Sequence, residues 1–320
     1  MKRKLQTMGW LTALLGMVLL WVSPAMATDY KLYIAGTQVT DANCNNLKDI
    51  EGVTVAEGGE FKYDPATKTL TMKEVTVSVG DRKNAIWNGD IEGLKIDVSG
   101  TNSLKATDVN NSTLLCFAST EIGGNGRLTV TNDNSAGVSV TGTTLTISDI
   151  TLEASGEWGI TGDSWSAEDE ILILKNATVN ATGRLAGIAN FSTLTTENCE
   201  IVVPEGGHFD KAKHAVVDAD GNKAKEVKIE PPIELYIAGT QVTNANCNNL
   251  KDIEGVTVGT DGEFKYDPAT KTLTMKEVTV TVGEGKNAIK NSGVEELKIN
   301  VSGTNSLEAT NWSKLKPKIP

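Results

Sequence analysis

The sequence has few of the residues from which metal, disulfide and nucleotide sites are built. It contains four cysteines, two histidines and 5% aromatic residues in 320 positions. It has no C-x-x-C pair, phosphate loop, G-x-S-x-G elbow or H-E-x-x-H motif, which are the patterns of zinc, P-loop and common hydrolase sites. His208 and His214 have no cysteine or acidic pair at ligand spacing. We therefore expect no metal, no cofactor and no assignable catalytic residue.

The four cysteines are too sparse and too unevenly placed for a disulfide scaffold. Cys44 and Cys247 occupy the same position of an internal repeat, so they are not expected to be partners. Cys116 and Cys199 lie among apolar residues, a pattern typical of small core residues on strands. The sequence predicts four free thiols.

The first 27 residues have the three parts of a secretory signal peptide. Met1–Lys4 is basic, residues 10–22 are apolar, and Ala25-Met26-Ala27 supplies small residues before a cleavage site at Thr28. The apolar run is shorter than the roughly 20 residues of a membrane-spanning helix. We expect export to the periplasm, the cell surface or the medium, without membrane insertion after cleavage.

Acidic residues outnumber basic ones. The formal net charge is −11, and loss of three cations with the signal peptide leaves 27 basic and 41 acidic residues, a net charge of −14. Nucleic-acid binding depends on clustered Lys and Arg, so this composition excludes nucleic acid, and also an anionic membrane surface, as expected partners. The charge also favours solubility.

An internal duplication determines the organisation of the chain. Leu32–Thr107 matches Leu235–Thr310 at a constant offset of 203 residues, with 62 of 76 positions identical. We predict a signal peptide at 1–27, a complete unit at 28–230, and a linker with a partial second copy at 231–320. Pro231-Pro232 marks the stiff, extended linker.

The periodicity is that of strands. Residues 61–63 and 69–72 flank Asp64-Pro65-Ala66-Thr67, which predicts a hairpin. A short helix is expected over Asp41–Ile50, with Cys44 and Leu47 on its inner face.

Weaker repeats follow within the first unit. The stretch beginning at Leu145 resembles the one beginning at Leu172, 27 residues on, and Leu194 opens a looser version 22 residues later. Such spacing predicts an all-β fold, a right-handed parallel β-helix or solenoid with an N-terminal hairpin cap. A β-sandwich uses similar strands and is the alternative.

The Leu-Tyr-Ile-Ala-Gly-Thr-Gln-Val-Thr opening, the Tyr-Asp-Pro-Ala-Thr-Lys-Thr-Leu-Thr-Met hairpin and the Thr/Asn/Gly-rich rungs resemble exported bacterial β-helical repeat proteins. Some of those are labelled carbohydrate-binding or adhesin-like. The shared residues are structural, so the resemblance implies architecture and transfers no catalytic residue.

Ligand binding is the leading functional hypothesis: a secreted or surface module that contacts a glycan or a surface protein. Carbohydrate recognition combines an aromatic ring with polar groups. We therefore predict a site on a projecting loop and its neighbouring rung corner, formed by Trp158, Trp165, Asp163, Glu168 and Asp169. Trp87 is Lys290 in the second copy, which argues against a required aromatic at that position.

Two other functions stay open. A polysaccharide hydrolase or lyase would need paired carboxylates, or carboxylates with a basic residue, whereas the mature chain has only Arg82, Arg127 and Arg184 as arginines. An enzyme is therefore the less favoured hypothesis. A structural spacer in a surface array is the third.

Overall fold

The computed structural model describes residues 28–80, 82–107, 111–163 and 169–309. The expected signal peptide at 1–27 lies outside the described residues, as do Trp165 and Glu168 of the predicted site.

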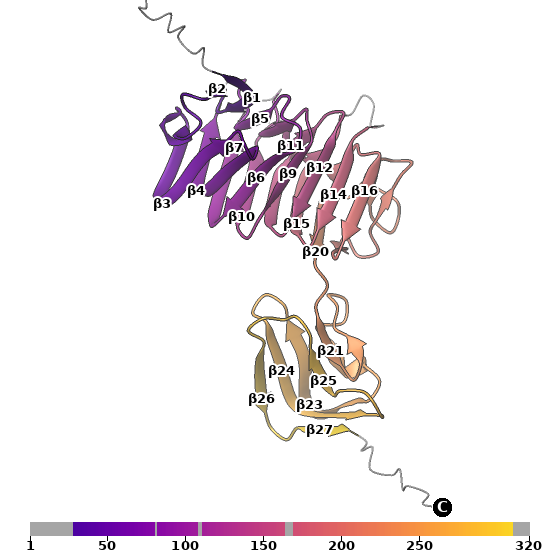
Figure 1. Cartoon of the computed structure of the whole chain (residues 1–320). Coiled ribbons are helices and arrows are strands. Elements are labelled where there is room, and N and C mark those ends of the chain that lie inside the picture. The colour runs from indigo at the N-terminus through magenta and orange to yellow at the C-terminus, as the bar shows by residue number, and fades with distance from the viewer. Residues whose placement is uncertain (1–27, 81, 108–110, 164–168, 310–320) are drawn as a thin grey trace, which may run out of the picture.

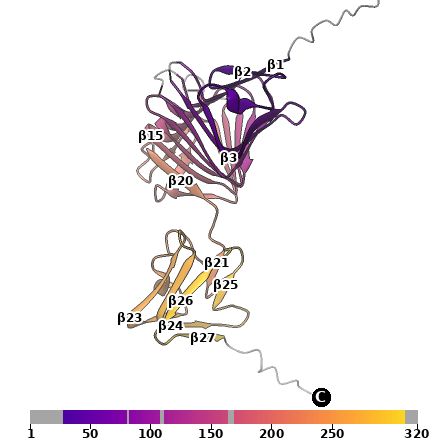
Figure 2. The ribbon, with the colours of Figure 1, turned by 90° about the vertical axis from the view of Figure 1, so that its left-hand side faces the viewer.

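The first unit is a parallel β-solenoid in which each coil adds a strand to three ladders (Figures 1 and 2). The first face runs in register through β4 (Thr69–Val79), β6 (Leu94–Ser99), β9 (Thr120–Gly124), β12 (Thr144–Ser148), β14 (Ile171–Lys175) and β16 (Thr193–Glu197).

The second face joins the end of β4 to β7 (Thr101–Ala106), β10 (Arg127–Asn132), β13 (Thr151–Thr161) and β15 (Thr178–Ala189). The third face contains β5 (Ile86–Asn88), β8 (Leu114–Cys116), β11 (Ala136–Val140) and the ends of β13 and β15. The predicted solenoid is confirmed and the β-sandwich alternative is wrong, because sandwiches are built from antiparallel sheets.

Inward-facing side chains of successive coils stack directly on one another and form the core. On the first face the paired residues Leu70, Ile96, Ile122, Ile147 and Leu174 are all buried. Because side chains alternate between the two faces of a strand, each coil needs only period-two patterning to add a layer to this core.

Antiparallel strands close both ends of the first unit. At the N-terminal end, β1 (Asp29–Ile34) pairs with β2 (Thr37–Thr40) and β5, and β3 (Val53–Asp64) pairs with β4. At the other end lie β17 (Glu200–Val203), β18 (His208–Asp210), β19 (Ala215–Val217) and β20 (Glu226–Glu230). Of these, β20 pairs with both β15 and β17, and β19 pairs with β15. These caps cover the exposed edges that a solenoid would otherwise present.

The predicted hairpin is present, with Asp64 holding its turn. The Asp64 carboxylate accepts hydrogen bonds from Ala66 N at 2.9 Å and Thr67 Oγ1 at 2.8 Å. The Thr67 bond, followed by the Ala66 bond, lowers the pKa of this carboxyl from its ordinary value. Asp side chains in turns accept hydrogen bonds from groups two or three residues on, and these bonds hold the chain in its reversal of direction between the two strands.

The helix expected over Asp41–Ile50 is wrong. Only η1 (Leu47–Asp49) is helical, as a single 3-10 turn. The Asn43 side chain instead bonds Thr40 N and Gln38 O, and Cys44 O accepts from Tyr63 N of the hairpin at 2.7 Å. The Asn43 bonds hold the side chain against the preceding strand, and the Tyr63 bond takes the Cys44 carbonyl that a helix over these residues would use. Cys44 and Leu47 are nevertheless buried, as predicted.

The second copy repeats the capped start of the solenoid and has its own hydrophobic cluster. Its elements are β21 (Leu235–Ile237), β22 (Thr240–Gln241), η2 (Leu250–Asp252), β23 (Val256–Asp267), β24 (Thr272–Val282), β25 (Ile289–Asn291), β26 (Lys298–Ser302) and β27 (Ser306–Ala309).

Candidate functional site

Three residues of the predicted site are described. Trp158 lies on β13, half-buried, and packs against Ala186, Ala189 and Ala215. Asp163 follows β13 and is half-buried, and Asp169 is exposed shortly before β14. Trp158 therefore has a packing role, and the remainder of the predicted loop is outside the described residues.

An aromatic recess, which sequence reasoning missed, opens beside the N-terminal cap. Tyr33 of β1 stacks on Trp87 of β5, with ring centroids 4.5 Å apart and planes 18° apart. Phe117, just after β8, meets Trp87 edge to face with centroids 6.1 Å apart. The recess that these rings line has a volume of about 470 Å³. Offset-stacked and edge-to-face pairs are favourable ring geometries.

Strand register brings these rings together. Tyr33 pairs with Trp87 across the antiparallel β1–β5 ladder, and Leu115 is the next partner of Trp87 across β5–β8. Phe117 is held by its backbone N–H, which donates to Asn88 O at 2.8 Å. Its ring is 44% exposed, so the recess presents an apolar surface to solvent.

Two cations line the same recess. Arg82 and Lys83 are both exposed, and neither forms an ion pair within the described part of the chain. The Lys83 stem passes over Gly36, where an added Cβ would lie 3.0 Å from Lys83 Cγ. Gly36 has φ +78°, so it serves both the tight turn and the close approach of the lysine. Asn84 adds a polar lining group.

The Trp87 ring packs against its aromatic neighbours but leaves its indole N–H without a partner. Its Nε1 atom is buried and has no hydrogen-bond partner among the described residues. A buried donor without a partner costs about 1–3 kcal/mol. The second copy replaces this residue with Lys290, which lies over the Tyr236 ring at 5.2 Å from the centroid. The unit therefore folds without a tryptophan there.

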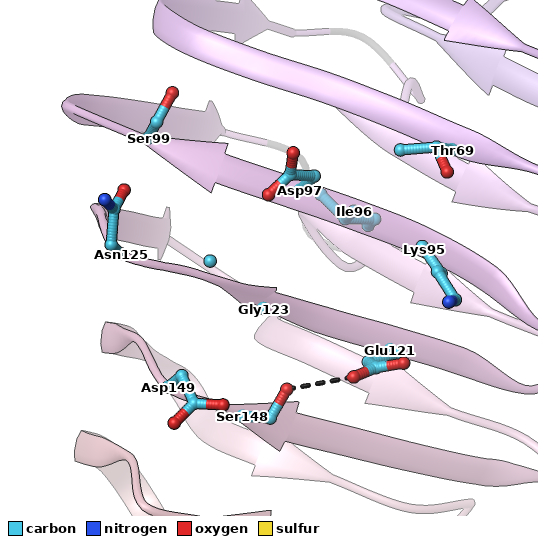
Figure 3. A pocket seen from close by; sticks show the side chains of 11 residues that line it. Thr69, Lys95, Ile96, Asp97, Ser99, Glu121, Gly123, Asn125, Ser148 and Asp149 are labelled. Atoms are coloured by element: carbon cyan, nitrogen blue, oxygen red, sulfur yellow. Dashed lines mark hydrogen bonds between the residues drawn. The ribbon is translucent and has the colours of Figure 1, made fainter.

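A second, acidic hollow lies on the first face (Figure 3). It has a volume of about 780 Å³, and its lining includes Asp97, Glu121, Asp149 and Lys95. Gly123 lies between Asp97 and Ser148 in the ladder, so the missing side chain creates the depression. The Ser148 hydroxyl donates to Glu121 Oε1 at 3.0 Å. This hollow offers hydrogen-bond acceptors, whereas the aromatic recess offers rings and cations.

The four cysteines are core residues. All four cysteines are unpaired and buried, as predicted, and burial raises the pKa of the Cys116 thiol to about 12. Among the described residues, no group of three or more His, Cys, Asp or Glu is placed to hold a metal ion. In the same residues, none of the helices has the length and apolar character needed to cross a bilayer.

The fold defines the class: this is a parallel β-solenoid protein with antiparallel caps. Comparisons of the chain with protein-family models, with curated proteins and with solved structures gave no match.

Arg82 and Trp87 are both among the positions at which the two copies differ, since the second copy has Gly285 and Lys290 there. The fold of the repeated unit therefore does not depend on either residue. This difference was the one sequence signal at the recess, and by itself it does not indicate a binding site.

Proposed function

We propose that the chain is an exported binding module, acting in the medium or at a cell surface, that recognises an acidic carbohydrate at the aromatic recess. The observation that carries the proposal is the contact of Tyr33, Trp87 and Phe117 in one recess that Arg82 and Lys83 also line. Neither cation forms an ion pair with another described residue. Aromatic rings pack against the apolar faces of sugar rings, and a few polar groups set orientation.

The cations determine the class of carbohydrate. Guanidinium and ammonium groups bind carboxylates and sulfates through charge-assisted hydrogen bonds, which are about twice as strong as neutral ones. Arg82 and Lys83 form no ion pair within the described ranges, although the expected mature charge of the chain is −14. An acidic sugar satisfies these cations and the aromatic surface together, whereas a neutral sugar uses only the latter.

The remaining parts of the proposal rest on the sequence. Met1–Ala27 supports export, and the resemblance to exported bacterial β-helical proteins supports a surface or extracellular binding role. The rigid solenoid then serves as a scaffold that holds the recess in a fixed geometry.

A glycan array tests the proposal. Mature protein from Thr28 should bind uronic-acid or sulfated oligosaccharides in preference to their neutral counterparts, with affinity falling as salt is raised. Arg82→Ala with Lys83→Ala should lower the affinity about tenfold or more, the loss expected for a charged hydrogen bond. Lys211→Ala, an exposed lysine outside the recess, is the matched control.

Binding of neutral oligosaccharides alone, or equal loss in the Lys211→Ala control, would contradict recognition of an acidic sugar by Arg82 and Lys83. A folded mature protein that binds no carbohydrate on the array would overturn the proposed function.

A further inference from the structure

The two cations of the aromatic recess differ in their contacts within the chain. Lys83 recurs as Lys286 in the second copy. In both copies the lysine stem passes over a turn glycine: a Cβ added at Gly36 would lie 3.0 Å from Lys83 Cγ, and one added at Gly239 would lie 3.2 Å from Lys286 Cδ. The two glycines have φ values of +78° and +84°. This packing belongs to the repeated fold, so Lys83 has a structural role whether or not a ligand binds.

Arg82 has no such role among the described residues. It is exposed, lines the recess and forms no ion pair in the described ranges. Its φ is +64°, and its equivalent in the second copy, Gly285, has φ +77°. Glycine adopts this left-handed conformation without steric cost, whereas a residue with a Cβ does not. The turn therefore forms with glycine in the second copy, and the repeated fold does not require an arginine at this position.

We propose that Arg82 gives the aromatic recess its specificity by binding the acidic group of a sugar whose ring packs against the three aromatic side chains. This inference rests on the proposed function. A guanidinium group is planar, and its paired N–H donors match two oxygens of one carboxylate or sulfate, whereas an ammonium group is a single point of charge. The Lys83 ammonium attracts any anion but lacks this fork, and its stem is held over Gly36. Arg82 therefore provides most of the discrimination between acidic and neutral sugars.

The second copy lacks both parts of this arrangement. It has glycine and lysine where the first copy has Arg82 and Trp87. That lysine, Lys290, lies over the ring of Tyr236, the equivalent of Tyr33, with its ammonium 5.2 Å from the ring centroid. A cation over a ring at this distance is a favourable contact, so the tyrosine of the second copy already has a partner. We therefore expect one acidic-sugar site per chain.

Calorimetric titration of the mature full chain with uronic-acid, sulfated and neutral oligosaccharides of equal length tests the assignment. Wild-type protein should bind at least one acidic ligand about tenfold or more tighter than the neutral one, with one site per chain. Arg82→Gly, which matches the second copy at this position, should keep its β-rich circular dichroism spectrum and bind all three ligands within about threefold of one another. Arg82→Lys keeps the charge without the fork and should lose most of the preference. The acidic ligand whose preference depends on Arg82 shows whether a carboxylate or a sulfate is bound.

Lys83→Met is the matched control, because it keeps an unbranched stem over Gly36 and removes the charge. Its preference should stay within about threefold of wild type, as for an exposed charge pair. A preference that persists in folded Arg82→Gly, or an equal loss in Lys83→Met, would overturn the assignment to Arg82 and leave the proposed function standing. Two equivalent sites per chain would also overturn it, because the second copy has no arginine there. A wild-type chain that binds no carbohydrate would overturn the proposed function itself, and this assignment with it.

Discussion

At the scale of single residues, one corner of the solenoid depends on left-handed backbone conformations. Asp149, Asn176 and Asn198 follow β12, β14 and β16 and have φ values of +54°, +46° and +52°. Their side chains form a ladder in which Asn176 Nδ2 donates to Asp149 Oδ1 at 2.7 Å and Asn198 Nδ2 donates to Asn176 Oδ1 at 2.9 Å. Asn and Asp adopt this region more readily than other non-glycine residues.

Substitution of Asn176 separates the backbone requirement from the hydrogen bonds. Asn176→Gly keeps the left-handed conformation and loses only exposed hydrogen bonds, so we expect a change in the free energy of unfolding of less than about 1 kcal/mol. Asn176→Val forces a β-branched residue into the same conformation, and the loss should exceed that of the glycine variant by about 1–2 kcal/mol. Denaturant unfolding measures both. Equal effects of the two variants would show that the corner does not depend on φ.

At the scale of elements, stacking of coils is what buries each strand, and the duplication provides matched positions that test it. Leu104 on β7 is covered by β10, whereas Leu307 on β27 is 52% exposed. Leu104→Ala should destabilise the first unit by about 2–5 kcal/mol. Leu307→Ala should change stability by no more than about 0.5 kcal/mol, because the side chain it removes is already half exposed. Similar losses at both positions would mean that Leu307 is covered within its own chain.

The elements were also the most predictable part of the molecule. The alignment of the stretches at Leu145 and Leu172 matches the observed register. The second stretch has one extra residue, and β15 accommodates it as a bulge between Gly183 and Ala186, opposite Gly156 and Trp158 of β13. Alternation of apolar and polar residues and a constant coil length are enough to predict the register of the strands, because each coil repeats the same pattern. The expected helix over 41–50 did not form, and the hairpin residue Tyr63 bonds the Cys44 carbonyl that such a helix would have used.

The aromatic recess was not predicted because its rings come from three separate strands and connections. Tyr33, Trp87 and Phe117 are far apart in the sequence, and only the β1–β5 and β5–β8 registers bring them together. The antiparallel pairing of β1 with β5 is a long-range contact, and the local periodicity of the sequence does not predict it. Trp158, by contrast, was easy to notice in the sequence and proved to pack against alanines.

At the scale of the whole molecule, the two large hydrophobic clusters of the described residues belong to the two copies, one before and one after Pro231-Pro232. Within the described residues, fewer coils stack in the second cluster than in the first, and stacked neighbouring coils stabilise a solenoid. Limited proteolysis should therefore cleave near Pro231 and degrade the C-terminal fragment first. Equal protection of both fragments would show that the second copy is self-sufficient or packs on the first.

The comparison of two tryptophans tests the central claim most directly. Calorimetric titration with the tightest acidic oligosaccharide from the array would compare wild-type mature protein with Trp87→Ala and with Trp158→Ala. The account predicts that Trp87→Ala lowers affinity about tenfold or more, as for a central aromatic contact, and that Trp158→Ala leaves it within about twofold. A loss confined to Trp158→Ala, or full affinity in a folded Trp87→Ala protein, would contradict the account and place the site away from the recess.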